Sequence, residues 1–319
     1  MNRAGGATTL VVGAGGLLGR AVTRELDRRG TSSVRARVRW GVRADAVEDL
    51  GRAVDELLRT AGDGPWAVVW AAGAGVTAST ADALGAELDV IRDVVSRLRA
   101  LPTDVAARGA LLFASSAGGL YAGSDDPPFT EETAPRPLAE YGRAKLDAED
   151  AFRTLGGAGT RVVLARIANI YGPGQNLAKP QGLISQLCLA HHTARPIGIY
   201  VPLDTLRDYL FVDDCAAMVL DTLDRAATLP PGSEPVVKIL ASQQSVSIAT
   251  LLGEMRRIYK RRPQAVLAAS PFTSRQALDL RFRSRVWPEL DHRAFVPLPV
   301  GIAATGADIG LALRSRTRG

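Results

Sequence analysis

The stretch that decides the fold is TTLVVGAGGLLGRAVTRELDRRG, residues 8–30. Its first part is a short apolar run typical of a buried strand, and its last part has the apolar spacing of a helix that ends at Gly30. Between them, Gly13, Gly16 and Gly19 recur every third residue. Glycines in such a turn let backbone N–H groups approach a pyrophosphate, and the helix N-terminus adds partial positive charge. The order of strand, glycines and helix therefore predicts dinucleotide binding rather than a turn needed only for packing.

Short apolar runs alternate with helical patterns through the first half of the chain. Further strands are expected over residues 33–40, 66–73, 109–116 and 160–173, and further helices over residues 44–62, 83–102 and 138–156. Strands that alternate with helices are joined by right-handed crossovers, which produce a parallel sheet covered by helices on both faces. The sequence therefore predicts an α/β fold with a doubly wound parallel sheet of the Rossmann type.

After residue 175 this rhythm gives way to prolines and longer connections. Open α/β sheets bind ligands at their carboxyl edge, where such irregular segments would gather into a smaller C-terminal α/β lobe. We expect residues 1–178 and 205–248 to form the dinucleotide-binding domain. Residues 179–204 and 249–319 would form the substrate-binding lobe.

Composition narrows the class of protein. The chain has 319 residues, of which 46% are hydrophobic and 23% charged, so it is large enough to bury a full core. Its longest apolar runs fall short of the roughly 18 residues that span a bilayer. The first apolar run is broken by glycines and does not match a secretion signal, which favours a cytoplasmic protein without membrane association. Two cysteines and three histidines give neither a disulfide framework nor metal-ligand spacing, so no metal is expected.

The formal net charge of +6 raises the question of nucleic-acid binding. The basic residues are mostly arginines, scattered along the chain without a basic block, and aromatic residues make up only 5%. Nucleic-acid interfaces cluster their charge and usually interleave it with stacking aromatics. The pattern therefore disfavours a nucleic-acid partner and remains compatible with an anionic small molecule.

A second constellation follows the glycines at a distance. Tyr141 and Lys145 stand four residues apart on an expected helix, and therefore on one face of it. A free phenol has a pKa of about 10, and a neighbouring ammonium favours the phenolate. Ser115 and Ser116 end the strand expected over residues 109–116, so their hydroxyls would face the same crevice as the dinucleotide. This order favours proton transfer by the tyrosine over a chance surface pair.

Five segments together resemble the extended short-chain dehydrogenases/reductases, the NAD-dependent epimerases and dehydratases that act on nucleotide sugars. They are GAGGLLG (13–19), FASSAGGLYAG (113–123), FTEETAPRPLAEYGRAK (129–145), ARIANIYGPGQN (165–176) and RDYLFVDD (207–214). The resemblance, over residues 8–290, implies that Tyr141 is the general acid/base, and that Lys145 tunes it and holds the nicotinamide ribose. Ser116 would position the substrate oxygen, with Ser115 as the alternative because AGGLY carries one residue more than the usual motif.

The resemblance also implies two sets of binding residues. The cofactor would contact Gly13, Gly15, Gly16, Leu17, Leu18, Gly19, Arg37, Arg39, Ala71, Ala72, Gly73, Tyr141, Lys145 and Ile167. The nucleotide-diphosphate sugar would contact Ser115, Ser116, Asn169, Asn176, Arg207 and Arg275. Arg207 is flanked by apolar residues that would bury it, and a guanidinium can hold a diphosphate through two hydrogen bonds. Two plainer alternatives stay open: a salt bridge from Arg207 to Asp208 or Asp213, and a turn-capping role for Asn169.

The choice of cofactor depends on the residues after the second strand. NAD-binding relatives place a carboxylate there for the ribose, but this chain has arginines, among them Arg37 and Arg39, and no carboxylate before Asp45. Arginines suit a 2′-phosphate, which favours NADP over NAD, although they are equally compatible with a solvent-facing strand edge. Two positions depart from the family pattern: Asp89 replaces the usual Asn, and Val12 replaces the usual Thr or Ser.

The residues directly after the serines narrow the reaction. Dehydratases of the family carry Asp-Glu at this place, whereas this chain has Ala117 and Gly118, which disfavours dehydration. A sugar 4-epimerase and a 4-ketoreductase remain, and a non-catalytic dinucleotide-sensing protein of the same fold is the alternative. Relatives often form homodimers through the helices represented here by residues 82–100 and 138–155, so a homodimer is expected.

Overall fold

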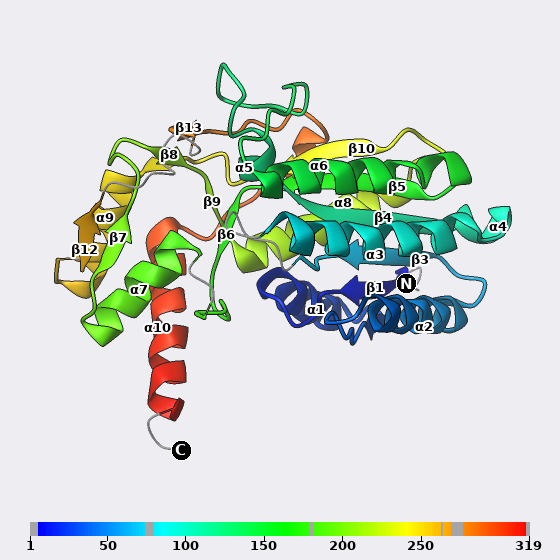
Figure 1. Cartoon of the computed structure of the whole chain (residues 1–319), viewed down its shortest axis with the longest axis horizontal. Helices are drawn as coiled ribbons and strands as arrows, with labels where there is room; N and C mark the ends of the chain where they lie inside the picture. Colours follow the sequence, from blue (N-terminus) through cyan, green and yellow to red (C-terminus); the bar gives the residue numbers. More distant parts are fainter. Residues whose placement is uncertain (1–5, 74–79, 179–180, 263, 269–276, 317–319) are drawn as a thin grey trace.

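A central parallel sheet organises the molecule (Figure 1). The computed structural model describes residues 6–73, 80–178, 181–262, 264–268 and 277–316. The six strands are β1 (Thr8–Val12), β2 (Ser33–Arg35), β3 (Trp66–Trp70), β4 (Gly109–Ser116), β5 (Arg161–Ile167) and β10 (Val236–Leu240). They lie in the order β10-β5-β4-β3-β1-β2, and all neighbours are parallel. The order reverses beside β1, which is where doubly wound sheets bind ligands.

Helices cover both faces of this sheet, as the alternation of patterns predicts. The helices are α1 (Leu17–Arg29) and α8 (Val212–Ala227) on one face, and α2 (Arg43–Ala61), α3 (Ala81–Arg99) and α6 (Glu140–Arg153) on the other. Successive residues of β1 alternate between the two cores: Leu10 and Val12 pack under α2 and α3, whereas Val11 packs under α1 and α8. The expected doubly wound α/β fold is confirmed. Short segments α4 (Thr103–Ala106), α5 (Ala117–Leu120) and η1 (Gly156–Ala158) connect these elements.

Two expected strands differ from the structure. The strand expected over residues 33–40 ends at Arg35, because the chain then turns so that the backbone N–H of Arg39 donates to the Asp49 carboxylate on α2. The strand expected over residues 160–173 is two strands, β5 and β6 (Asn169–Tyr171). Its second part leaves the central sheet and pairs with β9 (Tyr209–Phe211).

The C-terminal lobe has its own small sheets and its own core. Its elements are α7 (Leu183–Thr193), β7 (Ile197–Ile199), β8 (Leu206–Arg207), β11 (Val246–Ser247), α9 (Ile248–Tyr259), β12 (Ala265–Leu267), β13 (Asp279–Leu280), η3 (Pro288–Leu290) and α10 (Leu298–Arg316). β8 lies between β11 and β13, and β7 pairs with β12. The apolar faces of α7, α9 and α10 meet in one cluster, and these helices lie to the left of the sheet in Figure 1. The exact domain boundaries stay a prediction. β8 pairs with β11 and β13 and does not join the six-stranded sheet.

A buried ammonium holds C-terminal residues against the edge strand β10. Lys238 is fully buried, and its Nζ donates to Ser284 Oγ at 2.6 Å and to the Asp291 carboxylate at 2.7 and 2.8 Å. Ser284 Oγ in turn donates to Glu131 Oε1, which also accepts the backbone N–H of Ile239 at 2.9 Å. Burial raises the pKa of Asp291, and the nearby ammonium opposes this shift. The edge of the sheet is thereby covered by residues from two distant parts of the chain.

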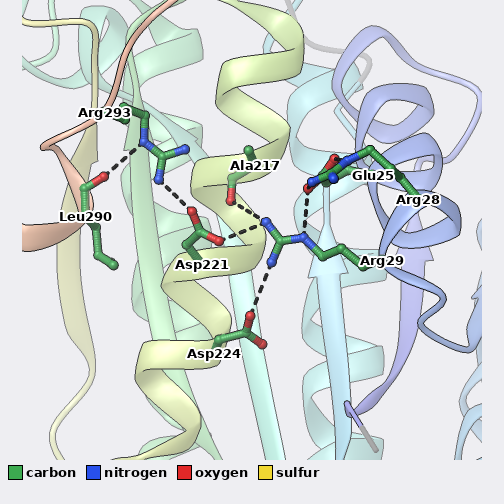
Figure 2. A network of polar contacts seen from close by, with 8 residues as sticks. All are labelled: Glu25, Arg28, Arg29, Ala217, Asp221, Asp224, Leu290 and Arg293. Atoms are coloured by element: carbon green, nitrogen blue, oxygen red, sulfur yellow. Dashed lines mark hydrogen bonds and ion pairs between the residues drawn. The ribbon is translucent and has the colours of Figure 1, made fainter. Parts of the chain in front are cut away.

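Helix α1 is fixed to α8 by a network of charges, shown in Figure 2. Arg29 donates to Glu25 at 2.7 Å and to Asp221 on α8 at 2.8 Å, and Arg293 reaches the other Asp221 oxygen at 2.6 Å. The hydrogen bond from Arg28 is the main reason that the pKa of Glu25 falls to about 2. Since α1 begins at the glycine turn, this network helps to fix the position of the helix N-terminus.

Candidate active site

The glycine turn is built by close backbone approach. Gly13 has φ +88°, and a Cβ there would lie 2.5 Å from the backbone N of Ala72. A Cβ on Gly19 would lie 2.1 Å from the carbonyl oxygen of Gly13. Both positions therefore require glycine, which is why β1, the turn and α1 can pack so tightly.

The N-terminus of α1 is open to a ligand. Gly16 caps the helix and donates its N–H to the Gly13 carbonyl at 2.9 Å, while a Cβ on Gly15 would meet nothing within 4 Å. The first turn of α1 carries no acidic side chain. Exposed N–H groups and the helix dipole favour an anion at this place, so the cradle fits the pyrophosphate of a dinucleotide.

The other expected cofactor contacts differ in what they offer. Leu17 is half-buried and Leu18 is buried in the core under α1, so that Leu18 can offer a ligand only its backbone. Ala71 donates its N–H to the Val12 carbonyl at 2.8 Å, which places residues 71–73 beside the glycine turn. Ile167 ends β5 opposite Ser116.

The two arginines after β2 have different surroundings. Arg39 is held by carboxylates of α2, with Nε 2.9 Å from Asp49 and other nitrogens 3.2 Å from Glu48 and 3.5 Å from Asp45. The hydrogen bond from Arg39 is the main cause that holds the pKa of Asp49 well below its usual range. Arg37 is exposed, and no ion pair engages it within the described ranges. Arg37 is therefore the arginine that is available to an anion.

Ser116 and Tyr141 lie on the same side of Gly119. Ser116 ends β4 and caps α5, and its Oγ accepts the N–H of Gly119 at 3.1 Å. A Cβ on Gly119 would lie 3.2 Å from Ser116 Oγ and 3.1 Å from Cε1 of the Tyr141 ring. The Ser115 hydroxyl is buried and has no hydrogen-bond partner among the described residues. The geometry thus brings Ser116, and not Ser115, to the tyrosine.

Lys145 lies beneath this pair, one helical turn along α6. Its Nζ donates to the Ala114 carbonyl at 3.4 Å and lies 4.8 Å from the centre of the Phe113 ring and 6.0 Å from that of the Tyr141 ring. A Cβ on Gly73 would lie 3.2 Å from this ammonium, so the chain after β3 runs directly beside it. The predicted Tyr-Lys face of the helix therefore points toward the carboxyl edge of the sheet.

The placement of α6 depends on another glycine. A Cβ on Gly142 would lie 2.2 Å from the Gly119 carbonyl oxygen and 2.7 Å from Cβ of Pro137. Because Tyr141 is the preceding residue, the first turn of α6 can reach the α5 backbone only with glycine at position 142. The sequence YG in this motif is thus a packing requirement of the site.

Two candidate substrate residues lie at the start of the lobe. Asn169 donates from Nδ2 to the Asp208 carbonyl at 3.0 Å, a contact between β6 and the β8–β9 connection. Arg207 is partly buried on β8, and NH1 donates to the Leu206 carbonyl at 2.8 Å. Burial lowers the pKa of Arg207 and raises that of Tyr209 to about 12.

Arg207 has no carboxylate partner among the described residues, so the alternative of a salt bridge to its acidic neighbours is wrong. Asp213 pairs with Arg24 at 2.6 Å. The Asp208 carboxylate turns away and accepts from the backbone N–H and the hydroxyl of Ser242 at 2.9 and 3.0 Å. The Asp279 carboxylate on β13 favours the charged form of Arg207 from beyond ion-pair distance, but its own ion-pair partner is Arg281 at 2.8 Å.

The remaining expected residues contribute less. Asn176 is exposed, and its Oδ1 accepts the N–H of Ala178 at 3.0 Å, which is a local turn. Arg275 lies outside the described residues. Sequence reasoning missed Glu87, which projects from α3 into the small cavity that Tyr141 and Lys145 line. The only signal for Glu87 in the sequence was its position two residues before Asp89, and no local pattern distinguishes it from other acidic residues on helices.

No helix within the described parts of the chain is both long and apolar enough to cross a membrane. The same residues contain no group of three or more His, Cys, Asp or Glu side chains that could hold a metal ion.

The chain is similar in sequence to two curated proteins. The chain is 29% identical to dTDP-4-dehydro-6-deoxyglucose reductase of Escherichia coli over 143 residues, which are 44% of this chain and 43% of the relative. It is 32% identical to dTDP-L-rhamnose 4-epimerase of Burkholderia thailandensis over 101 residues, 31% of this chain and 28% of the relative. The matches thus cover less than half of the length of these curated relatives.

Solved structures share the fold over nearly the whole chain. MoeE5 in complex with UDP-glucose and NAD aligns with a TM-score of 0.76 at 20% identity, covering 96% of this chain and 100% of that one. UDP-glucose 4-epimerase of Thermotoga maritima, with UDP-glucose, aligns with a TM-score of 0.74 at 19% identity, covering 96% and 99%. The sequence profile of the NAD dependent epimerase/dehydratase family matches residues 9–237. The chain therefore belongs to this family, among the extended short-chain dehydrogenases/reductases.

Proposed function

We propose that this chain is an NAD(P)-dependent enzyme that moves a hydride at C4 of a nucleotide-diphosphate sugar, as a 4-epimerase or a 4-ketoreductase. One observation carries the proposal: Ser116 Oγ and the Tyr141 ring lie on the same side of Gly119, with the Lys145 ammonium 6.0 Å from that ring. This is the arrangement that proton transfer to a sugar hydroxyl requires, and it lies at the ligand-binding edge of the sheet.

Each of the three side chains has a distinct role in the proposal. When bound, the nicotinamide ring supplies the hydride acceptor or donor. Tyr141 takes the proton from the sugar hydroxyl or returns it to the carbonyl oxygen. The Lys145 ammonium places a positive charge beside the tyrosine and would hold the nicotinamide ribose. Ser116, at the end of β4, hydrogen-bonds the same sugar oxygen and holds it beside the tyrosine.

The proposed cofactor is NADP or NAD, with NADP favoured. The cradle around Gly13 and Gly16 accepts either, because both carry the same pyrophosphate. Preference would be set at the ribose, where Arg37 is exposed and Arg39 is occupied by carboxylates of α2. We therefore assign the 2′-phosphate contact to Arg37. NAD is the cofactor named in the MoeE5 structure.

The proposed substrate carries a nucleotide diphosphate. Arg207 offers a partly buried guanidinium that forms no ion pair in the described chain, and Asn169 stands on the adjoining strand pair. The similar structures hold UDP-glucose, and the curated relatives act on dTDP sugars. Arg275 is proposed as a second diphosphate contact on sequence grounds.

Dehydration is disfavoured by the residues after Ser116. Ala117 is fully buried and Gly118 has no side chain, so neither can supply an acid or base for elimination. One curated relative is a reductase and the other an epimerase. Either reaction uses the same proton transfer by Tyr141, and they differ in whether the cofactor is exchanged after each turnover.

We further propose that the protein is a cytoplasmic homodimer that binds neither nucleic acid nor membranes. Helices α3 and α6 pack side by side, and an open groove between them is lined by basic side chains of α3 and acidic side chains of α6. These are Arg92, Arg99, Asp147 and Asp150. Two copies related by a twofold axis could set the basic stripe of one against the acidic stripe of the other.

The proposal is tested by measuring cofactor and turnover separately. Nicotinamide absorbance after purification reports bound cofactor, and titration with NADH and NADPH reports preference. Tightly retained NAD indicates the epimerase, and exchangeable NADPH indicates the ketoreductase. Tyr141→Phe should abolish turnover of UDP- or dTDP-sugars and leave cofactor affinity within a factor of about three. Full turnover in that variant refutes the assignment, and cofactor binding without any turnover in the native protein favours a sensor.

A further inference from the structure

A buried ion pair lies directly below the proposed catalytic side chains. Glu149 on α6 is 0% exposed and Arg166 on β5 is 3% exposed. Arg166 donates to both carboxylate oxygens of Glu149, from Nε at 3.1 Å and from NH2 at 2.8 Å, and its NH1 donates to Tyr121 Oη at 2.7 Å. Tyr121 Oη donates to the Thr130 carbonyl at 3.0 Å, and burial raises the pKa of this tyrosine, which keeps its hydroxyl a donor.

Glu149 continues the face of α6 that carries the site. Tyr141, Lys145 and Glu149 follow one another at steps of four residues, so each lies one turn from the next on the same side of the helix. The exposed fraction falls along this stripe to 9% at Lys145 and 0% at Glu149. The carboxylate that Arg166 grips is therefore the anchor nearest to Lys145 on the sheet side.

Arg166 also holds the elements that carry the serine. It lies opposite Ser115 in the β4–β5 pairing, and the next residue of β5 lies opposite Ser116. Tyr121, its second partner, caps the short helix α5 that Ser116 begins. One guanidinium is thus joined to α6, to the end of α5 and to the strand beside β4. These are the elements that set Ser116 relative to Tyr141.

An ion pair at this buried position indicates that the relative geometry of α6 and β5 must be fixed. Removing two charges from water opposes their attraction, and a buried pair can often be replaced by apolar side chains without loss of stability. An apolar pair lacks the directional hydrogen bonds from a guanidinium to a carboxylate, which fix both the position and the rotation of the helix. Arg153, half-exposed on α6, approaches the same carboxylate at 3.5 Å but does not bridge to the sheet.

We propose that Arg166 and Glu149 are positioning residues that set the rotation of α6, and with it the place of the Lys145 ammonium relative to the Tyr141 phenol and Ser116. This inference rests on the proposed hydride-transfer function. Neither residue touches the substrate; the pair acts through the helix.

The charges around Tyr141 make the inference measurable through pH. On its own helix the nearest charge is Lys145, and from α3 Glu87 lines the same small cavity. The Arg166–Glu149 pair itself carries no net charge, so replacing both residues with methionine leaves the electrostatic potential at Tyr141 nearly unchanged. A shift of the pH profile in the double variant would therefore report that the ammonium has moved.

The test compares the double variant Arg166→Met/Glu149→Met with the native protein and with Arg161→Met as a control. Arg161 is the first residue of the same strand and donates to the Ala107 and Leu229 carbonyls at the opposite end of the sheet. We expect the double variant to stay folded, to lose at least about tenfold in kcat at neutral pH with little change in KM, and to show an altered pH profile of kcat. The control should match the native profile. A double variant with native kcat and native pH profile would overturn the inference, and the same holds if the control shifts equally.

An activity-independent measurement separates this inference from the proposed function. Alkaline difference spectra, native minus Tyr141→Phe, follow formation of the Tyr141 phenolate without substrate. If the native protein turns over no nucleotide sugar, the proposed function fails, yet these spectra still test the positioning. A displaced curve in the double variant supports the inference, and an unchanged curve contradicts it. The single variant Glu149→Gln, which leaves the guanidinium without its counter-charge, should show both effects together with a lower unfolding temperature.

Discussion

Replacing Arg207 with methionine should weaken substrate binding while the unliganded protein keeps or gains stability. The guanidinium has five N–H donors, and within the described chain it uses one hydrogen bond, to the Leu206 carbonyl at 2.8 Å. Burial without a carboxylate partner disfavours its charge, as the lowered pKa indicates. Methionine keeps much of the apolar stem and removes the uncompensated cation, so the expected change in free energy of unfolding is zero or positive.

The loss of affinity can be worked from the hydrogen bonds that a diphosphate would accept. A charge-assisted hydrogen bond contributes about 1.5 to 3 kcal/mol, so losing a bidentate contact costs about 3 to 6 kcal/mol, or two to four orders of magnitude in Kd. Isothermal titration with UDP-glucose as the probe, together with thermal unfolding of the unliganded protein, measures both quantities. The matched control is Arg257→Met, because Arg257 lies on α9 in the same lobe and is already paired with Glu254 at 2.7 Å.

Two results would refute this reasoning. If Arg207→Met binds UDP-glucose within a factor of about three of the native protein, the guanidinium does not hold the diphosphate. If the variant loses several degrees in unfolding temperature, Arg207 has a structural partner that the described contacts do not contain. Opposite signs for stability and affinity in one variant are characteristic of a binding residue, whereas a structural residue loses both.

Three further predictions concern the site and its supports. Gly142→Ala places a Cβ 2.2 Å from the Gly119 carbonyl oxygen. The variant should therefore lose about 1 to 3 kcal/mol of stability in denaturant unfolding and have a lower kcat. A variant with native stability and native kcat would show that α6 can shift freely. Arg37→Ala should raise the Kd for NADPH about tenfold and leave that for NADH unchanged, and equal effects on both would exclude a 2′-phosphate contact. The pKa of Glu25 is lowered to about 2, chiefly by Arg28, so the stability that the Glu25 carboxylate contributes is present above its unfolded-state pKa and is lost as the pH falls toward 2. The difference in unfolding temperature between the native protein and Glu25→Gln should therefore disappear over that range. A constant difference contradicts this prediction.

The sequence predicts features that are encoded locally. The strand, glycine turn and helix over residues 8–30 are found as expected because apolar period and turn chemistry act within a few residues, and Gly30 ends α1 with φ 65°. The face shared by Tyr141 and Lys145 results from helical geometry alone, and the structure places it at the carboxyl edge of the sheet.

Features that depend on distant partners could not be predicted in this way. The strand after residue 33 is cut short because Arg39 turns to Asp49, a preference that no local alternation reveals. Arg207 lacks a salt bridge although Asp208 is next to it, since neighbouring residues of an extended strand point to opposite sides. Arg166 is a charged residue within an apolar strand, and this was a signal in the sequence. Its partner, Glu149, lies 17 residues away, and only the tertiary fold identifies it.

The hydrogen bonds and the ion pair of the buried Lys238 constrain how the polypeptide folds during synthesis. In chain order, β10 is the last strand of the six-stranded sheet. The ammonium of Lys238 on β10 is paired with Asp291, which comes more than fifty positions later in the chain. Until that later stretch has left the ribosome, the newly made sheet keeps an uncovered edge and an unneutralised lysine, the kind of surface on which nascent chains associate. The final tenth of the protein therefore completes the six-stranded sheet as well as the C-terminal lobe, and truncations that stop after β10 should yield insoluble material.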